Sequence, residues 1–342
     1  MTDSYYGPQA YDEHGVPNQQ RQTADPGRSW FNRTFDMRLP WGLTEDVAPQ
    51  SFRKRFRPEV LREIESKPSG FEHIEFHQRI DHQKYRHAPP AFRTNFFNIL
   101  AIFGKVIFLG MFPFFFLASL VDLYHTSSNV SFAEWGLQIL EVIPYFFGVP
   151  LAAWFIGAAP FKFFPRWAIK PSKGPQWELN RRTGLVTLFR YNKKGSWGKT
   201  GQPEEDSAPF YEFDAYLTNE IIPPGQVVHT LYLVHRYRPI LVPLGNLIGK
   251  VRGEECFALW DLFQNFMDTS RPLPDIPLWE EFRPNDPVTA EYDKKTNRPP
   301  RYWRDMDDDT WKQKESDMMA KVRSLTTPHR PNLMRRYVRY AH

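Results

Sequence analysis

Four histidines lie close together in the stretch EHIEFHQRIDHQKYRH, at positions 73, 77, 82 and 87. Histidine is the commonest protein ligand of transition metals, and residues four apart share a helix face, so His73 and His77 would point the same way. The first chemistry to consider is therefore a metal site, placed just before the long apolar segment that begins near residue 96.

The spacing of these histidines does not favour such a site. Membrane desaturases and hydroxylases bind iron through several histidine boxes that include HxxHH pairs, and this chain has no HxxHH. The stretch HIEFH also lacks the HExxH order that places a general base beside a zinc ion. We predict no metal and no cofactor, and the role of the cluster at His73, His77, His82 and His87 stays open.

The acidic run Asp305, Asp307, Asp308 and Asp309 is a second candidate for cation binding. It lacks the glycine and the distal glutamate of an EF-hand loop. Acids in the first turn of a helix interact favourably with the helix dipole, so we expect a helix over 305–325 that begins with this run.

Basic and aromatic side chains are the remaining candidates for binding. Lipid headgroups or a protein partner are predicted to contact six of them: Arg181, Arg182, Lys193, Lys194, Trp279 and Trp303. A basic residue near an anionic membrane surface is worth about 1 kcal/mol. The alternative is that the four basic residues form an ordinary solvated face.

The sequence lacks the signatures of common enzymes. It has no P-loop, no GxSxG, no dinucleotide fingerprint and no convincing pair of nucleophile and base. Its one cysteine, Cys256, lies on the apolar side of a predicted helix and is expected to be an inert core thiol. The net charge is only +5 and no nucleic-acid-binding motif is present, so we predict neither an enzyme nor a nucleic-acid-binding protein.

Two apolar segments must position everything else. The mean hydropathy of the chain is −0.55, yet residues 99–121 and 136–159 are almost free of charge, with only Lys105 and Glu141 inside them. Each is long enough to cross the ~30 Å hydrocarbon layer as a helix. We therefore predict a two-helix transmembrane hairpin, with bends at Pro144 and Pro150.

The orientation follows from the basic residues beside the spans. Residues 51–93 and 161–200 each contain ten Lys or Arg, and the connecting loop 125–135 contains none. Basic flanks stay in the cytoplasm. Both termini are therefore predicted to be cytoplasmic, in a protein with two membrane spans.

A β-rich module is predicted after the second span. WELNRRTGLVTLFRY at 177–191 indicates a hairpin with Gly184 in the left-handed conformation. Further strands are expected at 210–217, 227–237 and 239–245, and residues 254–268 have the spacing of an amphipathic helix that packs on the sheet.

The predicted fold class is an α+β membrane protein. Its parts are listed in chain order: a disordered tail at 1–27, a cytoplasmic juxtamembrane arm at 28–94, the hairpin at 95–160, the β module at 171–268 and a Pro- and Trp-rich extension with a helix at 269–342. Residues 198–209 are expected to form a loop.

The module resembles the pleckstrin-homology-like domains of bacterial membrane proteins. The resemblance depends on the strand–Thr-Gly–strand opening and on the closing helix. The whole pattern, with WELNRRTG and the later PLPDIPLWEEF, also resembles an uncharacterised family of proteobacterial two-span inner-membrane proteins found beside type VI secretion effector genes. That resemblance implies an immunity or accessory protein whose partner is a secreted toxin or one of its loading proteins.

Three functions follow as hypotheses. The first is a membrane-anchored, non-enzymatic protein that binds such an effector. The second is a structural or scaffolding membrane protein that contacts anionic lipid. The third, and weakest, is a metal-dependent membrane enzyme that uses the histidine cluster.

Overall fold

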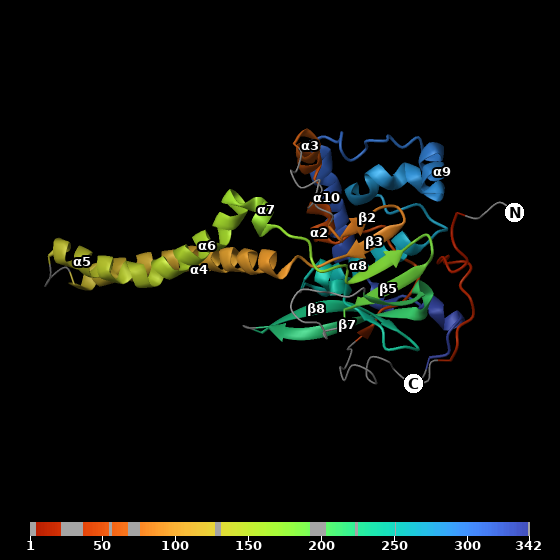
Figure 1. The fold of residues 1–342 in the computed structure, drawn as a ribbon, viewed down its shortest axis with the longest axis horizontal. Helices are drawn as coiled ribbons and strands as arrows, with labels where there is room; N and C mark the ends of the chain where they lie inside the picture. Colours follow the sequence, from red (N-terminus) through yellow and green to blue (C-terminus); the bar gives the residue numbers. More distant parts are fainter. Residues whose placement is uncertain are drawn as a thin grey trace. The chain divides into compact units, whose positions relative to one another are not determined.

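The fold is known from a computed structural model of the chain (Figure 1). It describes the following residues: 5–21, 37–54, 57–67, 76–126, 131–191, 203–222, 225–249 and 251–340.

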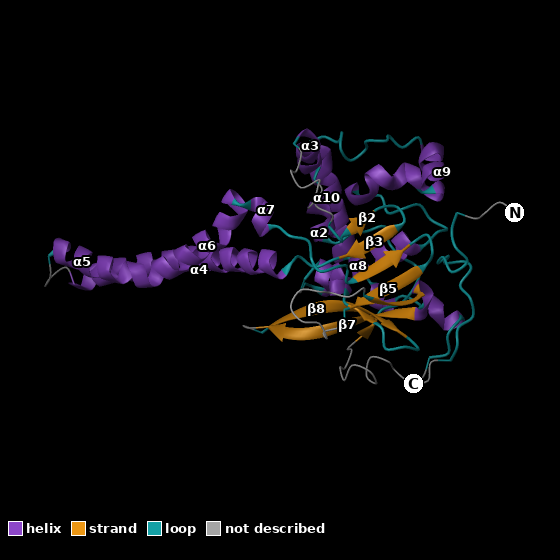
Figure 2. Cartoon of the chain, in the orientation of Figure 1, coloured by secondary structure: helices purple, strands orange, loops and turns teal. Residues whose placement is uncertain are grey.

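The chain forms two compact units. The helical unit comprises His73–Phe76 and Pro89–Gly174, and the α+β unit comprises Met1–Glu72, His77–Ala88 and Pro175–His342. Figure 2 shows helices alone in the first unit and both helices and strands in the second. The coarse prediction of a mixed α+β protein with antiparallel sheets is confirmed.

The helical unit is built from two long helical segments joined near residues 127–130. Its elements are α4 (Phe92–Thr126), α5 (Phe132–Ile143), the π-helical turn η1 (Pro144–Gly148), α6 (Val149–Phe163) and α7 (Pro165–Ala168). The turn η1 begins at Pro144 and ends two residues before Pro150. The sequence predicts bends at these two prolines.

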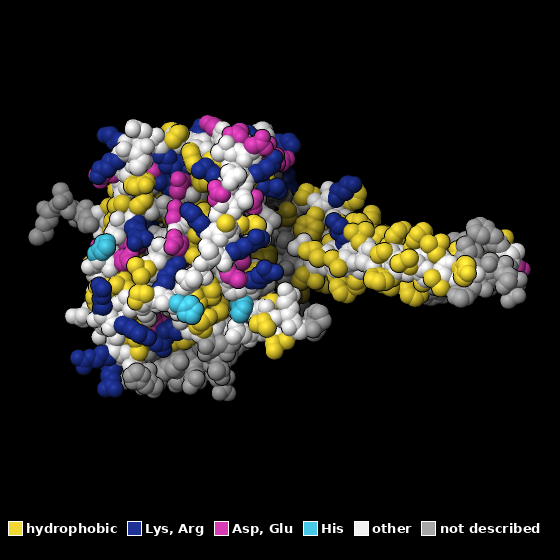
Figure 3. All heavy atoms as spheres, turned by 180° about the vertical axis from the view of Figure 1, so that it is seen from behind, with side chains coloured by type: hydrophobic (Ala, Val, Ile, Leu, Met, Phe, Trp, Pro, Cys, Tyr) yellow, Lys and Arg dark blue, Asp and Glu magenta, His cyan; other side chains and the backbone are white. Residues whose placement is uncertain are grey.

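Two stretches of the described chain are long and apolar enough to span a membrane, Phe92–Asp122 and Phe146–Phe163. Only 6% and 11% of their most apolar windows are buried within the structure. Figure 3 shows hydrophobic side chains covering the surface of this unit. The predicted span at 99–121 falls inside the first stretch, whereas the one at 136–159 overlaps the second only over 146–159.

Glycines set the distance between α4 and α6. A Cβ added at Gly104 would overlap the backbone of Trp154 and lie 2.6 Å from the carbonyl oxygen of Pro150, and one added at Gly157 would lie 2.6 Å from the Cα of Ala101. Residue 101 thus faces 157 and residue 104 faces 154, so the two helices run antiparallel with their backbones in close contact. Small residues have this role where two helices pack closely in lipid.

The α+β unit contains two antiparallel sheets. One has the strand order β1 (Met37–Arg38), β7 (Phe213–Ile222), β8 (Gln226–His235) and β9 (Leu241–Val242). The other has the order β2 (Arg79–Ile80), β3 (Lys84–His87), β4 (Trp177–Asn180), β5 (Leu185–Arg190) and β6 (Glu204–Pro209).

The helices of this unit lie before, between and after the strands. They are α2 (Gln50–Lys54), α3 (Pro58–Ser66), α8 (Gly253–Met267), α9 (Pro287–Thr296) and α10 (Asp308–Arg323). Short 3₁₀ turns are η2 (Phe210–Glu212), η3 (Leu244–Leu247), η4 (Pro277–Asn285), η5 (Thr327–His329) and η6 (Leu333–Arg336).

The helical unit is an insertion between two paired strands. His87, the last residue of β3, pairs with Trp177, the first residue of β4, although 89 residues lie between them. The part of the helical unit from Pro89 to Gly174 takes the place of a β-turn, so both ends of this part connect to neighbouring strands of one sheet.

The hairpin predicted at 177–191 is confirmed. β4 and β5 pair from Trp177↔Leu188 to Asn180↔Leu185, and Gly184 has φ +75°. The turn is also covered, because a Cβ at Gly184 would lie 2.6 Å from the Cα of Ala10.

The N-terminal tail is not disordered over residues 5–21, where the prediction is wrong. Gly7 donates a backbone hydrogen bond to Arg182 (2.7 Å), Tyr11 is 2% exposed, and Thr269 donates to the Tyr11 carbonyl (2.8 Å). The polar composition of this segment gives no sign that Tyr11 is buried, and the buried ring orders the segment.

The boundaries of the β module are wider than predicted. Strands β1, β2 and β3 come from residues 37–87, within the expected juxtamembrane arm, and they pair with strands of the predicted module. β6 forms within the expected loop 198–209, where all six of its residues pair with β5 and Ala208 enters the core. The strand expected at 210–217 begins only at Phe213, after the turn η2, and the one expected at 239–245 is two residues long.

Helix α8 is the centre of the core. Its bounds agree with the prediction, but its polar side is buried too: Asp261 and Gln264 are 0% and 2% exposed. The segment 42–45 covers that side, since the backbone N–H groups of Gly42 and Glu45 donate to Gln264 (2.8 Å) and Asp261 (3.0 Å). The predicted amphipathic helix is therefore enclosed on both faces. The largest aromatic side chains of this core are Trp41, Trp177, Trp260, Trp279, Tyr11, Phe210, Phe213, Phe263 and Phe266.

Cys256 lies in this core with 0% exposure. Burial raises the pKa of its thiol to about 12, with Glu255 and Glu254 acting in the same direction. We expect a maleimide to leave the folded protein unlabelled at neutral pH and to label one thiol per chain in denaturant. Labelling without denaturant, measured by intact mass, would contradict this burial.

Candidate functional site

The histidine cluster is not brought together as a metal site among the described residues. No group of three or more His, Cys, Asp or Glu side chains there is placed to hold a metal, and His73 lies outside the described residues. His82 contacts the Gln83 side chain (3.1 Å), and the His87 ring stacks on Trp177 with 5.2 Å between ring centroids. Burial lowers the pKa of His87, which favours the neutral ring.

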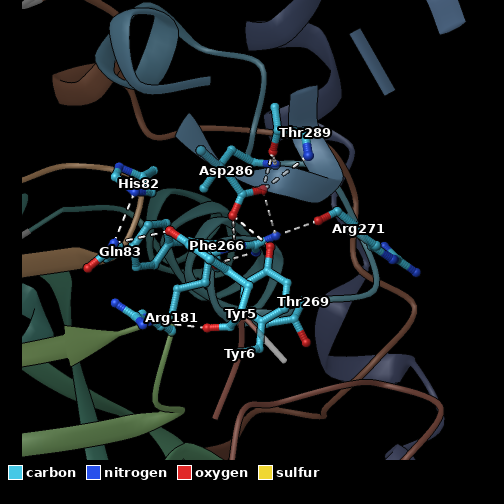
Figure 4. A network of polar contacts seen from close by, with 12 residues as sticks. Tyr5, Tyr6, His82, Gln83, Arg181, Phe266, Thr269, Arg271, Asp286 and Thr289 are labelled. Carbon is cyan, nitrogen blue, oxygen red and sulfur yellow. Dashed lines mark hydrogen bonds and ion pairs between the residues drawn. The ribbon is translucent and has the colours of Figure 1, made fainter. Parts of the chain in front are cut away.

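Arg181 does not reach lipid or a partner, as the sequence had suggested. It is fully buried, and its guanidinium donates to the carbonyl oxygens of Phe266 and Asp268 (both 2.7 Å) at the end of α8 (Figure 4). It also donates to the carbonyl oxygen of Arg271 (2.6 Å). A guanidinium at the C-terminus of a helix satisfies carbonyls that have no partner within the helix.

Asp286 is the counterion of Arg181. Nε of Arg181 lies 3.1 Å from Oδ1 of Asp286, and the same carboxylate accepts hydrogen bonds from Tyr6 (2.7 Å) and from the Thr289 amide (3.1 Å). Burial alone would raise the pKa of Asp286, but Arg181, Thr289 and Tyr6 together hold it below its usual value. The network joins β4, α8, α9 and the N-terminal segment (Figure 4), so its role is structural.

The other predicted contact residues have mixed positions. Arg182 is exposed and donates to the Tyr5 carbonyl (3.1 Å), while Lys193 and Lys194 lie outside the described residues. Trp279 is 0% exposed and stacks on Phe266 with 5.0 Å between centroids.

Trp303 is also buried, with 8% exposure. Its ring N–H donates to Asp275 (2.9 Å) and its backbone amide donates to Glu280 (2.6 Å). The prediction that Trp279 and Trp303 contact a partner is therefore wrong for this fold, because both complete the core of their own unit.

A basic groove lies beside the C-terminal segment. It has a volume of about 1030 Å³ and is lined by Arg38, Pro40 and residues of the segment 328–340. We call it the C-terminal basic groove. Its charged lining consists of Arg38, His329, Arg330, Arg335 and Arg339, and none of its lining residues is acidic. Lys and Arg side chains gather at the lower left of Figure 3, on the side where the C-terminus lies.

Three of these basic residues are exposed and unpaired. His329, Arg335 and Arg339 have no hydrogen bond or ion pair with a side chain anywhere in the described part of the chain. Hydrogen bonds within the protein fix the side chains of Arg38 and Arg330. Arg38 donates to the Tyr216 hydroxyl (3.0 Å) and Arg330 donates to Asp261 (2.8 Å). The groove thus has fixed basic groups at its base and free ones at its rim.

The backbone under the groove is firmly packed. Met334 and Val338 are 0% and 3% exposed, and Asn332 accepts a hydrogen bond from the Met334 amide (3.0 Å) at the start of η6. Leu333 donates a backbone hydrogen bond to Trp41 (3.0 Å). The basic side chains therefore stand on an ordered support rather than on a loose tail.

Asp261 gives this support a dependence on pH. Burial raises the pKa of Asp261 to about 6, although the Glu45 amide and Arg330 both lower it. An unfolded aspartate titrates near pH 4, so the folded state binds more protons than the unfolded state between about pH 4 and pH 6. The stability from this group is complete below about pH 4 and is lost as the pH rises through 6.

We therefore compare the wild-type protein with Asp261→Asn. The unfolding free energy of the wild type, minus that of the variant, should fall by about 3 kcal/mol between pH 4 and pH 7. Chemical denaturation at a series of pH values measures it, and the subtraction removes the other titrating groups. A difference that stays constant over this range would show that folding does not raise the pKa of Asp261.

The sequence contained one signal for the groove, the tail HRPNLMRRYVRY at 329–340, which combines bases with aromatics. It could not show that Arg38, from β1, lines the same hollow. Searches with this chain found no matching family model, no similar curated protein and no similar solved structure.

Proposed function

We propose that this chain is a membrane-anchored, non-enzymatic binding protein of a bacterial inner membrane. In this proposal α4 and the segment α5–α6 cross the membrane as a hairpin, and the α+β unit, with both termini, stays in the cytoplasm. The α+β unit carries the binding surface.

The observation that carries the proposal is the insertion of the helical unit between β3 and β4. Because His87 and Trp177 are paired, the chain must leave and re-enter the α+β unit at adjacent points. A single crossing would place these points on opposite sides of a bilayer, whereas two crossings return the chain to the same side. Two antiparallel apolar helices meet that requirement.

The surface of the helical unit supports the same proposal. Its apolar side chains are exposed: Phe114 is 75% and Phe103 60% exposed. An apolar surface of this kind needs lipid or protein to cover it. Trp135 near one end donates to Asp122 (2.9 Å), and Trp167 near the other end lies under Arg93 (4.6 Å), which is the placement of interfacial aromatics.

The position of Lys105 fits two packed helices better than a single helix whose charge faces lipid. Its ammonium lies 5.8 Å from the ring centroid of Trp154 on α6. A cation above an aromatic face is stabilised by the ring quadrupole.

The topology can be tested with single-cysteine variants, because the native Cys256 is buried. Ser127→Cys, within the segment 125–135 that the sequence predicts to connect the spans, should react with a membrane-impermeant maleimide in intact cells. Lys295→Cys, whose side chain is 71% exposed in the α+β unit, should react only after permeabilisation. The reverse labelling would invert the orientation, and labelling of both in intact cells would exclude the cytoplasmic placement.

The resemblance to proteins encoded beside type VI secretion effectors suggests what is bound, a secreted toxin or one of its loading proteins. An affinity pull-down of the detergent-solubilised protein from its native cells, read by mass spectrometry, tests this. Recovery of one stoichiometric partner that is toxic to cells unless this chain is present supports an immunity protein. Recovery of the chain with lipid alone favours the scaffolding alternative.

The pleckstrin-homology-like fold stays a prediction. Two antiparallel sheets packed against α8 support it, and the strands contributed by residues 37–87 extend beyond the module predicted at 171–268. An experimental structure of the full chain would decide it.

A further inference from the structure

We infer that the C-terminal basic groove binds an acidic, carboxylate-rich segment of a protein partner. The inference deepens the proposed function, since it assigns the binding surface and the chemistry of what occupies it.

Buried arginines of this unit are already neutralised by acidic partners. Arg181 pairs with Asp286 (3.1 Å), Arg236 with Asp214 (2.8 Å) and Arg283 with Asp293 (2.6 Å). Arg335 and Arg339 have no such partner among the described residues, and both are exposed. Neither is needed to hold the fold, so both are free to bind an anion from outside.

The geometry favours carboxylates. Arg335 and Arg339 are four residues apart on a segment fixed by the buried Met334 and Val338, and Arg38 lines the same hollow from β1. A guanidinium recognises a carboxylate through two parallel hydrogen bonds, and clusters of arginines are a recurring means of binding acidic motifs. An ordered support reduces the entropy lost on binding.

The size and lining of the groove favour a polypeptide. A volume of about 1030 Å³ is at the upper end of the range for small-molecule pockets. Pro331 is exposed and adds apolar surface beside the basic groups, which side chains of a peptide can cover. A flat bilayer would reach Arg335 and Arg339 at the rim but not Arg38 at the base, and a nucleic-acid backbone would make little use of the apolar part.

The chain's own neighbouring segment is a poor occupant. Residues 21–36 precede β1 and contain Arg21, Arg28 and Arg33 against Asp25 and Asp36. Three basic and two acidic residues do not complement a basic groove. Charge therefore favours a separate acidic partner.

The test uses the full-length protein in a non-ionic detergent and a fluorescein-labelled hexaglutamate peptide, with hexaglutamine as the neutral control. Fluorescence anisotropy should show binding of hexaglutamate only, weakening as the salt rises from about 50 to about 200 mM. In the variant Arg335→Glu/Arg339→Glu, the affinity should fall at least about tenfold, because two attractive contacts become repulsive.

The matched control is Arg57→Glu/Arg252→Glu. It makes the same change in charge at two exposed arginines that lie outside the groove, and its affinity should stay within about twofold of the wild type. Equal thermal unfolding of both variants and the wild type shows that any loss of binding is not a loss of folding.

Several results would overturn the inference. They are wild-type protein that does not bind hexaglutamate, equal loss in the two double variants, or tighter binding of a single-stranded oligonucleotide, inorganic phosphate or anionic vesicles than of the peptide. The pull-down separates this inference from the proposed function. A partner held equally by wild type and Arg335→Glu/Arg339→Glu leaves the function standing and excludes the groove, whereas capture of no partner by the wild type counts against the function itself.

Discussion

Replacing Arg181 by alanine should lower the unfolding free energy of the α+β unit by about 3–5 kcal/mol, which is the usual cost of breaking a buried ion pair from one side. Asp286 would stay buried without its counterion, and three carbonyl oxygens near the end of α8 would lose their donors. Globular domains have only about 5–15 kcal/mol of stability, so this one change removes a large part of it.

Denaturation followed by tryptophan fluorescence measures the effect, because Trp41, Trp177, Trp260 and Trp279 are all buried in this unit. The control is Arg182→Ala at the next residue, where the side chain is exposed and makes one hydrogen bond to the Tyr5 carbonyl. It should cost about 1 kcal/mol or less. Equal losses for the two variants would refute the assigned role of Arg181.

A double-mutant cycle separates the ion pair from the other contacts. Asp286→Ala also removes the cap of α9, since Asp286 accepts from the Thr289 amide. The double variant Arg181→Ala/Asp286→Ala should therefore lose less than the sum of the two single variants, with a coupling energy of about 1–3 kcal/mol. Simple additivity would mean that the two charges act independently.

Replacing Gly104 by leucine should force α4 and α6 apart and destabilise the helical unit by more than the about 1–3 kcal/mol typical of overpacking. The new side chain would meet backbone atoms of Trp154 and Pro150, which cannot rotate away as a side chain can. It would also displace Trp154 from Lys105.

Gly110 on the same helix provides the matched control. A Cβ added there has no neighbour within 4 Å, so Gly110→Leu changes composition and volume equally without a clash. Loss of helicity on titration with sodium dodecyl sulfate should occur at a lower concentration for Gly104→Leu than for Gly110→Leu and the wild type. Coincident transitions for the two variants would show that close backbone contact does not hold the pair together.

The local parts of the structure could be predicted from the sequence because their signals are short-range. The β4–β5 hairpin needs only alternating residues around a turn with Gly184 in the left-handed region. The bounds of α8 follow from apolar spacing and from Glu254 and Glu255 in the first turn. The apolar segments follow from the length of chain without charge.

The contact residues could not be predicted, because burial depends on distant parts of the chain. Arg181 looks like a surface base beside Arg182, and only the approach of Asp286, 105 positions later, encloses it. Trp279 and Trp303 stand in a polar, proline-rich stretch that gives no local sign of burial. The polar side of α8 is covered by residues 42–45, more than 200 positions earlier.

The sequence by itself determined two apolar helices, a β hairpin and a central helix, since each depends on periodicity or turn chemistry within about twenty residues. Only the tertiary structure decided that strands from residues 37–87 complete the sheets, that the helical unit is inserted between paired strands, and that Arg38 joins the C-terminal arginines around one groove. The edge of a strand can pair with any other strand that has free backbone N–H and C=O groups. The pairing of β3 with β4 across the insertion therefore leaves no periodic pattern in the sequence. It is fixed instead by which arrangement buries Tyr11, Trp41 and Trp177 in one core.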